Sequence, residues 1–162
     1  MTLDAALHWI QNTSLASTIG ESSWLFPTIE SLHVLAITLV VGTISIIDLR
    51  LINVAWRDCA LTELLAEILP LTRMCFFVAA ISGGLLFSSH AAKYFNNTPF
   101  RLKMLLMLLA GLNMLVFHLF ELRSVHDWDI ESRVPRGAMA AGALSLIFWV
   151  SVVSCGRWIG FV

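Results

Sequence analysis

The chain contains four long runs of residues without a formal charge, separated by short segments in which charged side chains gather. The runs are Ser31–Ile47, Met74–Ala92, Met104–Phe120 and Ala138–Gly156. An α-helix needs about 20 residues to cross the hydrocarbon core of a membrane, and apolar flanking residues extend each run to that length. The pattern predicts an all-α integral membrane protein, a four-transmembrane-helix bundle. The predicted spans are about 24–50, 70–94, 100–122 and 137–160.

Composition excludes a soluble globular protein. Apolar residues make up 58% of the 162 residues and charged residues only 13%, and the mean hydropathy is +0.83. Soluble domains carry about 25% charged residues, so this chain lacks the polar surface that water requires. We expect a single membrane domain over residues 1–162, with the lipid bilayer as its main partner. Nothing in the sequence indicates nucleic-acid binding.

Two shorter segments have amphipathic patterns. The apolar residues that repeat at helical spacing within segment 1–22 are Leu3, Ala6, Leu7 and Ile10. This spacing predicts a short N-terminal interfacial helix that lies on the membrane, with a poorly ordered tail as the alternative. Asp4 stands where a signal peptide would carry basic residues, so cleavage is not expected. Between the first two spans, Thr62 is predicted to cap a short helix that Pro70 ends.

Basic residues are distributed unequally between the two expected membrane faces. Four spans place both termini, and the loop after the second span, on one face. That face carries Lys93, Arg101, Lys103 and Arg157. The other face carries Arg50, Arg57, Arg73, Arg123, Arg133 and Arg136. Because the cytoplasmic side of a membrane protein holds the excess of Lys and Arg, both termini are predicted to be periplasmic.

Two ionisable residues lie inside the first predicted span. Glu30 and His33 are three positions apart, which places them on the same side of a helix. A charged side chain at the bilayer centre costs at least ~2.5–3.5 kcal/mol, so such residues mark a functional site or a buried polar network.

The expected depth of each histidine in the membrane separates His33 and His90 from His118. His33 follows the start of the first span at Trp24 by about nine residues, and His90 lies near the end of the second span, which runs in the opposite direction. Both are therefore expected near the N-terminal face. His118 lies almost a full span deeper, which at about 1.5 Å per residue is too far to share a metal centre with His33. We expect His33 and His90 to act together, with His118 as a secondary metal candidate.

A b-type haem is the cofactor that fits this pair best. Neutral imidazoles on facing helices of a bundle can ligate haem iron axially. Gly83, two turns before His90, leaves room for a flat porphyrin, and Glu30 can accept the Nδ1 proton of a neighbouring histidine. The basic residues expected to bind the haem propionates are Lys93, Arg101 and Lys103. Each feature also has a structural interpretation, because glycines permit close helix packing and interfacial cations anchor helices.

A second polar layer is expected at the opposite face. Its members are Asp48, Arg50, Arg73, His118, Glu121 and Arg123. Salt bridges that close this end of the bundle are the favoured interpretation, and a second haem, a quinone headgroup pocket or a proton path are the alternatives. The cysteines lack CxxC spacing, so neither a disulfide scaffold nor a thiolate metal site is expected.

Two stretches of the chain carry a recognisable motif. The first is Glu21-Ser22-Ser23-Trp24-Leu25-Phe26-Pro27-Thr28-Ile29-Glu30-Ser31-Leu32-His33, followed by Gly42 and Asp48-Leu49-Arg50. The second comprises Pro99-Phe100, Lys103, Ala110-Gly111-Leu112-Asn113 and Phe117-His118. Together they resemble a family of small bacterial inner-membrane proteins that is defined only as a domain of unknown function. The resemblance implies a four-helix fold in the inner (plasma) membrane and no particular activity.

The same resemblance marks individual residues. Within the family pattern, the residues that occupy the motif positions here are Glu30, His33, Lys103, Asn113 and His118. His90 lies outside the motifs. At the level of the fold alone, the chain is also similar to four-helix b-type cytochromes and to the membrane halves of copper-resistance proteins.

Three functions follow from these patterns as alternatives. The first is a b-type cytochrome-like protein that passes electrons between quinone and a partner, or anchors a redox complex. The second is a copper or ion transport or handling protein, in which His33, Glu30 and methionines bind the ion. The third is a non-catalytic structural subunit of a larger complex or a homo-oligomer. An electron-transfer or accessory role is favoured over a stand-alone enzyme.

Overall fold

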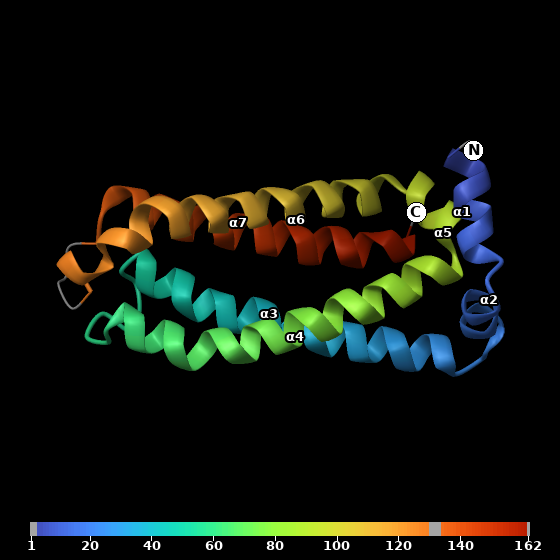
Figure 1. Ribbon diagram of the computed structural model, residues 1–162, viewed down its shortest axis with the longest axis horizontal. Coiled ribbons are helices and arrows are strands. Elements are labelled where there is room, and N and C mark those ends of the chain that lie inside the picture. The colour runs from blue at the N-terminus through green and yellow to red at the C-terminus, as the bar shows by residue number, and fades with distance from the viewer. Residues whose placement is uncertain (1–2, 130–133, 162) are drawn as a thin grey trace.

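The computed structural model describes residues 3–129 and 134–161 and confirms the all-α membrane fold (Figure 1). Every regular element in these residues is a helix. Four of the helical segments are long and apolar enough to cross a membrane: Leu25–Leu51, Leu61–Ser89, Thr98–Glu121 and Arg136–Phe161. The first two are the helices α3 and α4. The third is α6 (Thr98–Val116) with the π-helical turn η1 (Phe117–Glu121), and the fourth is α7 (Arg136–Trp158) with the 3₁₀ turn η3 (Ile159–Phe161).

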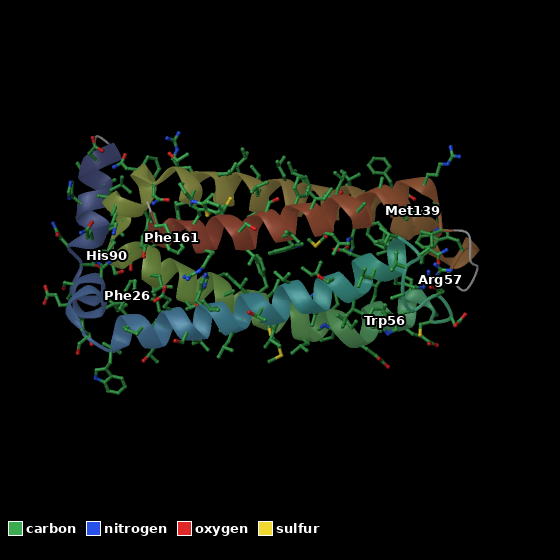
Figure 2. All side chains as sticks on the ribbon, turned by 180° about the vertical axis from the view of Figure 1, so that it is seen from behind. Phe26, Trp56, Arg57, His90, Met139 and Phe161 are labelled. Atoms are coloured by element: carbon green, nitrogen blue, oxygen red, sulfur yellow. The ribbon has the colours of Figure 1, made fainter. Side chains whose placement is uncertain are left out.

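The four spans form two antiparallel pairs that lie along the long axis of the molecule. Figure 1 shows α3 beside α4 and α6 beside α7, and α3 also contacts α7. Both chain termini lie at one end, here called the terminal end. The opposite end, here called the loop end, holds the loop between α3 and α4 and the 3₁₀ helix η2 (Leu122–Asp127). Figure 2 labels Phe26 and His90 at the terminal end and Trp56 and Arg57 at the loop end.

The outer surface of the bundle suits a lipid environment. Each span presents a large apolar side chain that is more than 60% exposed: Leu35, Phe77, Leu108 and Val150. In water, burial of such surface would be the main source of stability. Here the backbone hydrogen bonds are satisfied within each helix, and the exposed side chains match the hydrocarbon of a bilayer.

Two short helices cover the terminal end and confirm the predicted N-terminal helix. They are α1 (Leu3–Gln11) and α2 (Ser14–Glu21). Thr13 caps α2, because its hydroxyl oxygen accepts a hydrogen bond from the Ala16 amide at 3.4 Å. The helix α1 contacts the short helix α5 (Ala91–Asn96), and α2 contacts α4. The ordered segment therefore packs across the end of the bundle and buries Leu7 and Ile19.

The prediction that Pro70 ends a short helix is wrong. The helix α4 runs without a break from Leu61 to Ser89, with Pro70 inside it. Proline removes one backbone hydrogen bond, and membrane helices tolerate this loss when packing fixes the turns on either side. Leu65 and Ile68 pack against the core cluster one turn before the proline, and the Thr72 hydroxyl donates to the Ile68 carbonyl at 3.0 Å.

A polar layer does form at the loop end, and buried Arg50 is its centre. Its side chain is 1% exposed and donates to the Cys59 carbonyl at 2.9 Å and to the Asp129 carbonyl at 3.1 Å. The Asp129 carboxylate accepts from the Thr62 amide at 2.9 Å. These bonds tie the loop between α3 and α4 to the residues that follow η2. Arg73 and Arg123 are exposed and stand outside this layer.

The spans approach each other closely beside this layer. A Cβ added to Gly142 of α7 would lie 2.9 Å from the Leu51 Cβ and 3.1 Å from the Asp48 carbonyl oxygen. Asn113 of α6 donates to the Ala141 carbonyl of α7 at 2.8 Å. Small residues therefore bring α3, α6 and α7 together at the loop end, as expected for membrane helices.

Candidate functional site

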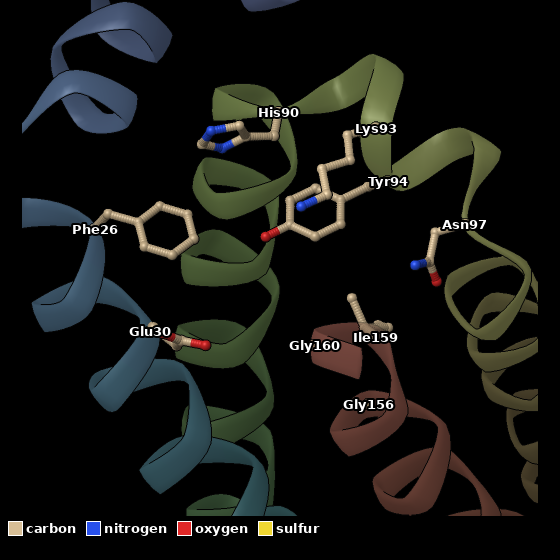
Figure 3. A pocket seen from close by; sticks show the side chains of 9 residues that line it. All are labelled: Phe26, Glu30, His90, Lys93, Tyr94, Asn97, Gly156, Ile159 and Gly160. Atoms are coloured by element: carbon tan, nitrogen blue, oxygen red, sulfur yellow. The ribbon is translucent and has the colours of Figure 1, made fainter. Parts of the chain in front are cut away.

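Two cavities lie between the spans, both nearer the terminal end. The outer cavity has a volume of about 360 Å³ and is shown in Figure 3. Its lining residues are Phe26, Glu30, His90, Lys93, Tyr94, Asn97, Gly156, Ile159 and Gly160. The inner cavity is smaller, at about 60 Å³. Its lining residues are His33, Ile37, Val40, Phe76, Ala79, Ala80, Lys103, Met107, Trp149 and Val152.

A break in the backbone positions His90 at the outer cavity. The helix α4 ends at Ser89, and His90 adopts φ −142° and ψ 45° before α5 begins. The imidazole meets the Phe26 ring edge-on, with 5.6 Å between centroids, and the Tyr94 ring in the same manner at 6.3 Å. Its Nδ1 lies 3.0 Å from the Ser89 hydroxyl. Rings from α3 and α5 thus fix the orientation of His90.

Charged and phenolic groups face the same space. Figure 3 shows the Tyr94 hydroxyl and the Lys93 ammonium directed into the outer cavity, with the Glu30 carboxylate on its opposite side. Burial raises the pKa of Tyr94 above its ordinary value, and the negative charge of Glu30 raises that pKa further. Tyr94 therefore remains a neutral hydrogen-bond donor at neutral pH.

His33 lies deeper, at the inner cavity, and is hydrogen-bonded across the helix pair. Its Nδ1 is 3.0 Å from the Ser82 hydroxyl oxygen. That hydroxyl has a single proton, which it donates to the Val78 carbonyl at 2.7 Å. We infer that Ser82 accepts from His33, so that Nδ1 carries the proton and Nε2 of the neutral ring holds a lone pair. Hydrogen bonding thus fixes which ring nitrogen can act as a base or ligand.

Gly83 makes room for this imidazole. A Cβ at position 83 would lie 2.8 Å from the His33 Cε1, closer than two carbon atoms can approach. The space expected to admit a porphyrin beside Gly83 is occupied by the His33 ring itself. Gly84, the next residue, has open space where its side chain would stand.

Lys103 lies between the two cavities. It is half-buried and lines the inner cavity together with His33. Its Nζ would be 3.6 Å from a Cβ at Gly156, and Gly156 lines the outer cavity. Among residues 3–129 and 134–161 no carboxylate pairs with the ammonium, and the Cys155 thiol is its electrostatic neighbour. The missing side chain at Gly156 therefore leaves a cation close to the floor of the outer cavity.

The predicted haem ligands do not share a cavity. His90 lines the outer cavity and His33 the inner one, and neither cavity is lined by both. Gly83, beside His33, precedes His90 by seven residues, which is about 10 Å along a helix. The part of the chain that the structure describes has no cluster of three or more His, Cys, Asp or Glu side chains suited to a metal. The two histidines that were expected to share one haem therefore line different cavities.

The other predicted site residues fall into three groups. Glu30 and Lys93 join His90 at the outer cavity, and Lys103 joins His33 at the inner one. Arg101 is exposed and lines neither cavity. His118 lies in the turn η1, towards the loop end, where its Nδ1 is 3.0 Å from the Met114 carbonyl oxygen of its own helix.

Several lining residues were missed from the sequence, although patterns that point to them exist. Tyr94 is the only tyrosine of the chain and follows His90 by one helical turn. Phe26 precedes Glu30 by one turn. Gly156 and Gly160 are four positions apart, which places both on one face at the end of the last span. Spacing alone does not show that these three pairs meet.

Comparison with known proteins identifies the family. A family model described as a family of unknown function, DUF6644, matches residues 7–162. No curated protein and no solved structure matches the chain. Because the match extends over nearly the whole sequence, the chain belongs to the DUF6644 family, whose function is unknown.

Proposed function

We propose that this protein binds a quinone, a lipid-soluble electron carrier with a polar ring, in the outer cavity. The observation that carries the proposal is the composition of that cavity, which combines aromatic walls with His90, Tyr94, Glu30 and Lys93. Small-molecule sites in helix bundles are mostly apolar, whereas five of the nine residues that line this cavity have polar side chains, which suits the polar ring of the ligand. The cavity lies at the ends of the spans, where the ring of a membrane-dissolved quinone would meet the aqueous boundary.

The size of the cavity favours a single ring system. Ligand sites commonly measure about 300–1,000 Å³, and the outer cavity, at about 360 Å³, is at the lower end. A quinone ring with its tail in the bilayer fits this volume better than a porphyrin does. On the wall formed by α7 and η3, Gly156 and Gly160 have no side chains and Ile159 is the side chain that lines the cavity, so that a flat ring can approach the backbone at the two glycines.

The polar groups match the chemistry of a quinone. Reduction of a quinone to a quinol takes two electrons and two protons. His90 and the Tyr94 hydroxyl can hydrogen-bond the ring oxygens, and Glu30 and Lys93 can exchange protons with water at the mouth of the cavity. The electrons come from a redox partner protein. This chain supplies binding and proton exchange, and so serves as an electron-transfer or anchor subunit.

Filling the cavity tests the proposal. A side chain at Gly160 meets no atom within 4 Å, so Gly160→Leu should fold normally and occupy the outer cavity. Gly111→Leu is the matched control, because position 111 also has open space and lines neither cavity. Binding of a short-chain ubiquinone analogue to the detergent-solubilised protein is measured by equilibrium dialysis. We expect Gly160→Leu to bind the analogue at least tenfold more weakly than the unaltered protein does, and Gly111→Leu to bind it equally well. Absence of binding to the unaltered protein, or equal binding to both variants, contradicts the proposal.

Haem b is the second candidate, and one observation favours it. The Ser82 hydrogen bond leaves the His33 Nε2 lone pair available, which is the arrangement typical of metal-bound histidines. The reduced-minus-oxidised optical spectrum of the purified protein decides whether haem is bound. Haem bands that are lost in His33→Ala and retained in His118→Ala would support haem. A colourless protein isolated from cells supplied with a haem precursor would exclude it.

The side chains around His33 at the inner cavity favour copper less than haem. Met107 lines the inner cavity with His33, which gives one thioether beside one imidazole. Lys103 lines that cavity too. Its positive charge opposes a cation there, because Coulomb repulsion is strong where water is excluded.

A further inference from the structure

We propose that the ligand of the outer cavity is held as an anion, and that Lys103 is the residue that selects this charge. The inference rests on the proposed function, since it assigns a charge to the quinone-class ligand. It starts from the position of Lys103, whose Nζ would stand 3.6 Å from a Cβ at Gly156, a residue that lines the outer cavity. The sequence led us to expect Lys103 beside haem propionates, whereas its place beside Gly156 assigns it to the ligand of the outer cavity.

The charges around the cavity do not balance. Among the lining residues, Glu30 is negative and Lys93 is positive. Lys103 adds a second positive charge from the other side of Gly156. One negative charge on the ligand would complete the balance. An oxygen anion is the natural partner, because a charge-assisted hydrogen bond from an ammonium is about twice as strong as a neutral one.

The surroundings of Lys103 strengthen its attraction for an anion. The inner cavity that it lines is walled by apolar side chains, including Val40, Trp149 and Val152. No acidic residue lines that cavity. An ammonium in such a place is half-buried and has the Cys155 thiol, not a carboxylate, as its electrostatic neighbour, which is costly. A ligand anion bound beside Gly156 would give the ammonium a partner and so remove that cost, whereas a neutral ring would leave it. Lys103 is thus a specificity-determining residue.

Gly156 is the second residue on which the selection of an anion depends. A side chain there would contact Nζ at a residue that lines the outer cavity. A methyl group at 3.6 Å is in ordinary van der Waals contact with the ammonium, so Gly156→Ala should fold. It should nevertheless separate the cation from a bound ring.

Two probes of nearly the same shape test the charge. One is a hydroxynaphthoquinone, which is ionised at neutral pH, and the other is its methyl ether, which cannot ionise. We expect the unaltered protein to bind the anion about tenfold more tightly than the ether, which corresponds to ~1.4 kcal/mol. Lys103→Met should bind both probes equally, with its affinity for the ether unchanged. Lys103→Arg should keep the preference. Arg101→Met is the charge-matched control on the same helix and should behave as the unaltered protein.

The outcomes separate this inference from the proposed function. If the unaltered protein binds both probes equally, the selection of an anion is wrong and quinone binding stands. If it binds neither probe, both proposals fail. A preference that persists in Lys103→Met also overturns the inference. If Lys103→Met does not fold, Gly156→Ala replaces it, and an undiminished preference in that variant has the same meaning. Displacement of the anionic probe by phosphatidylglycerol would assign the charge to a lipid phosphate and overturn the inference.

Discussion

His33 Nδ1 lies 3.0 Å from the Ser82 hydroxyl oxygen, and this bond joins the imidazole of α3 to α4 inside the membrane-spanning part of the bundle. The hydroxyl donates its own proton to the Val78 carbonyl at 2.7 Å. The donor in the bond to Ser82 is therefore the His33 ring. This relationship fixes the protonated nitrogen and leaves Nε2 as the reactive one.

The first prediction is that neutral His33 carries its proton on Nδ1. In water the proton of neutral imidazole resides mainly on Nε2, so the expected state is distinctive. Ring ¹⁵N chemical shifts of selectively labelled protein in detergent measure it directly. Ser82→Ala should shift the ring towards the ordinary tautomer, because the hydroxyl acceptor is lost and the Ala79 carbonyl is the acceptor that remains. A His33 ring protonated on Nε2 in the unaltered protein would refute the assignment.

The second prediction concerns the glycine beside this histidine. In Gly83→Ala the new Cβ would lie 2.8 Å from the His33 Cε1, so the ring must move away from Ser82. We expect a loss of about 1–3 kcal/mol in the free energy of unfolding, as in other overpacked interiors. Gly84→Ala has open space and should be neutral or slightly stabilising, because alanine favours the helix. Equal unfolding midpoints for the two variants would show that the contact does not matter.

The sequence predicts the spans well because membrane helices depend on local composition. Four uncharged runs of sufficient length require four helices, whichever partners they choose. Pro70 was misread because a helix-breaking residue in water is tolerated where packing on both sides holds the helix together. The sequence pattern also led us to expect a short N-terminal helix, and two are present, separated at Thr13.

The site was predicted less completely, because depth along a helix does not fix rotation about it. Depth correctly placed Glu30, His90 and Lys93 near one face, and the outer cavity collects them. It did not show that the His33 ring points towards Gly83 and away from His90. That depends on how α3 and α4 are turned towards each other, which long-range packing decides. Tyr94 reaches the site only because the chain breaks at His90.

A third prediction tests the polar layer at the loop end. Arg50→Met removes the donors to the Cys59 and Asp129 carbonyls while keeping an apolar stem of similar length. We expect a loss of about 1–3 kcal/mol in the free energy of unfolding, and faster proteolysis of the loop between α3 and α4. Arg57→Met is the control, because Arg57 is exposed in that loop. The prediction fails if the loop is cleaved at the same rate in both variants.

The fourth prediction is a pH dependence at Tyr94. Burial and the charge of Glu30 raise its pKa above the ordinary value, which is about 10. The folded state therefore holds the phenolic proton more tightly than the unfolded state does. The stability linked to this proton is fully present below pH ~10 and is lost as the pH rises through the pKa of the folded protein.

A single titration checks this prediction, because Tyr94 is the only tyrosine in the chain. The ultraviolet band of the phenolate should appear with a midpoint above that of free tyrosine. Glu30→Gln should lower the midpoint without bringing it fully to the free value, since burial remains. A midpoint equal to that of free tyrosine, in protein shown to be folded at that pH, would place Tyr94 in open solvent.

Photoaffinity labelling with an azidoquinone tests the central proposal most directly. After illumination in detergent micelles and digestion, mass spectrometry locates the cross-links. The account predicts labels on the segments that line the outer cavity, namely 26–30, 90–97 and 156–160, and their loss in the presence of excess unlabelled quinone. Labels spread over the lipid-exposed faces of the four spans, or labels that excess quinone does not suppress, would contradict it.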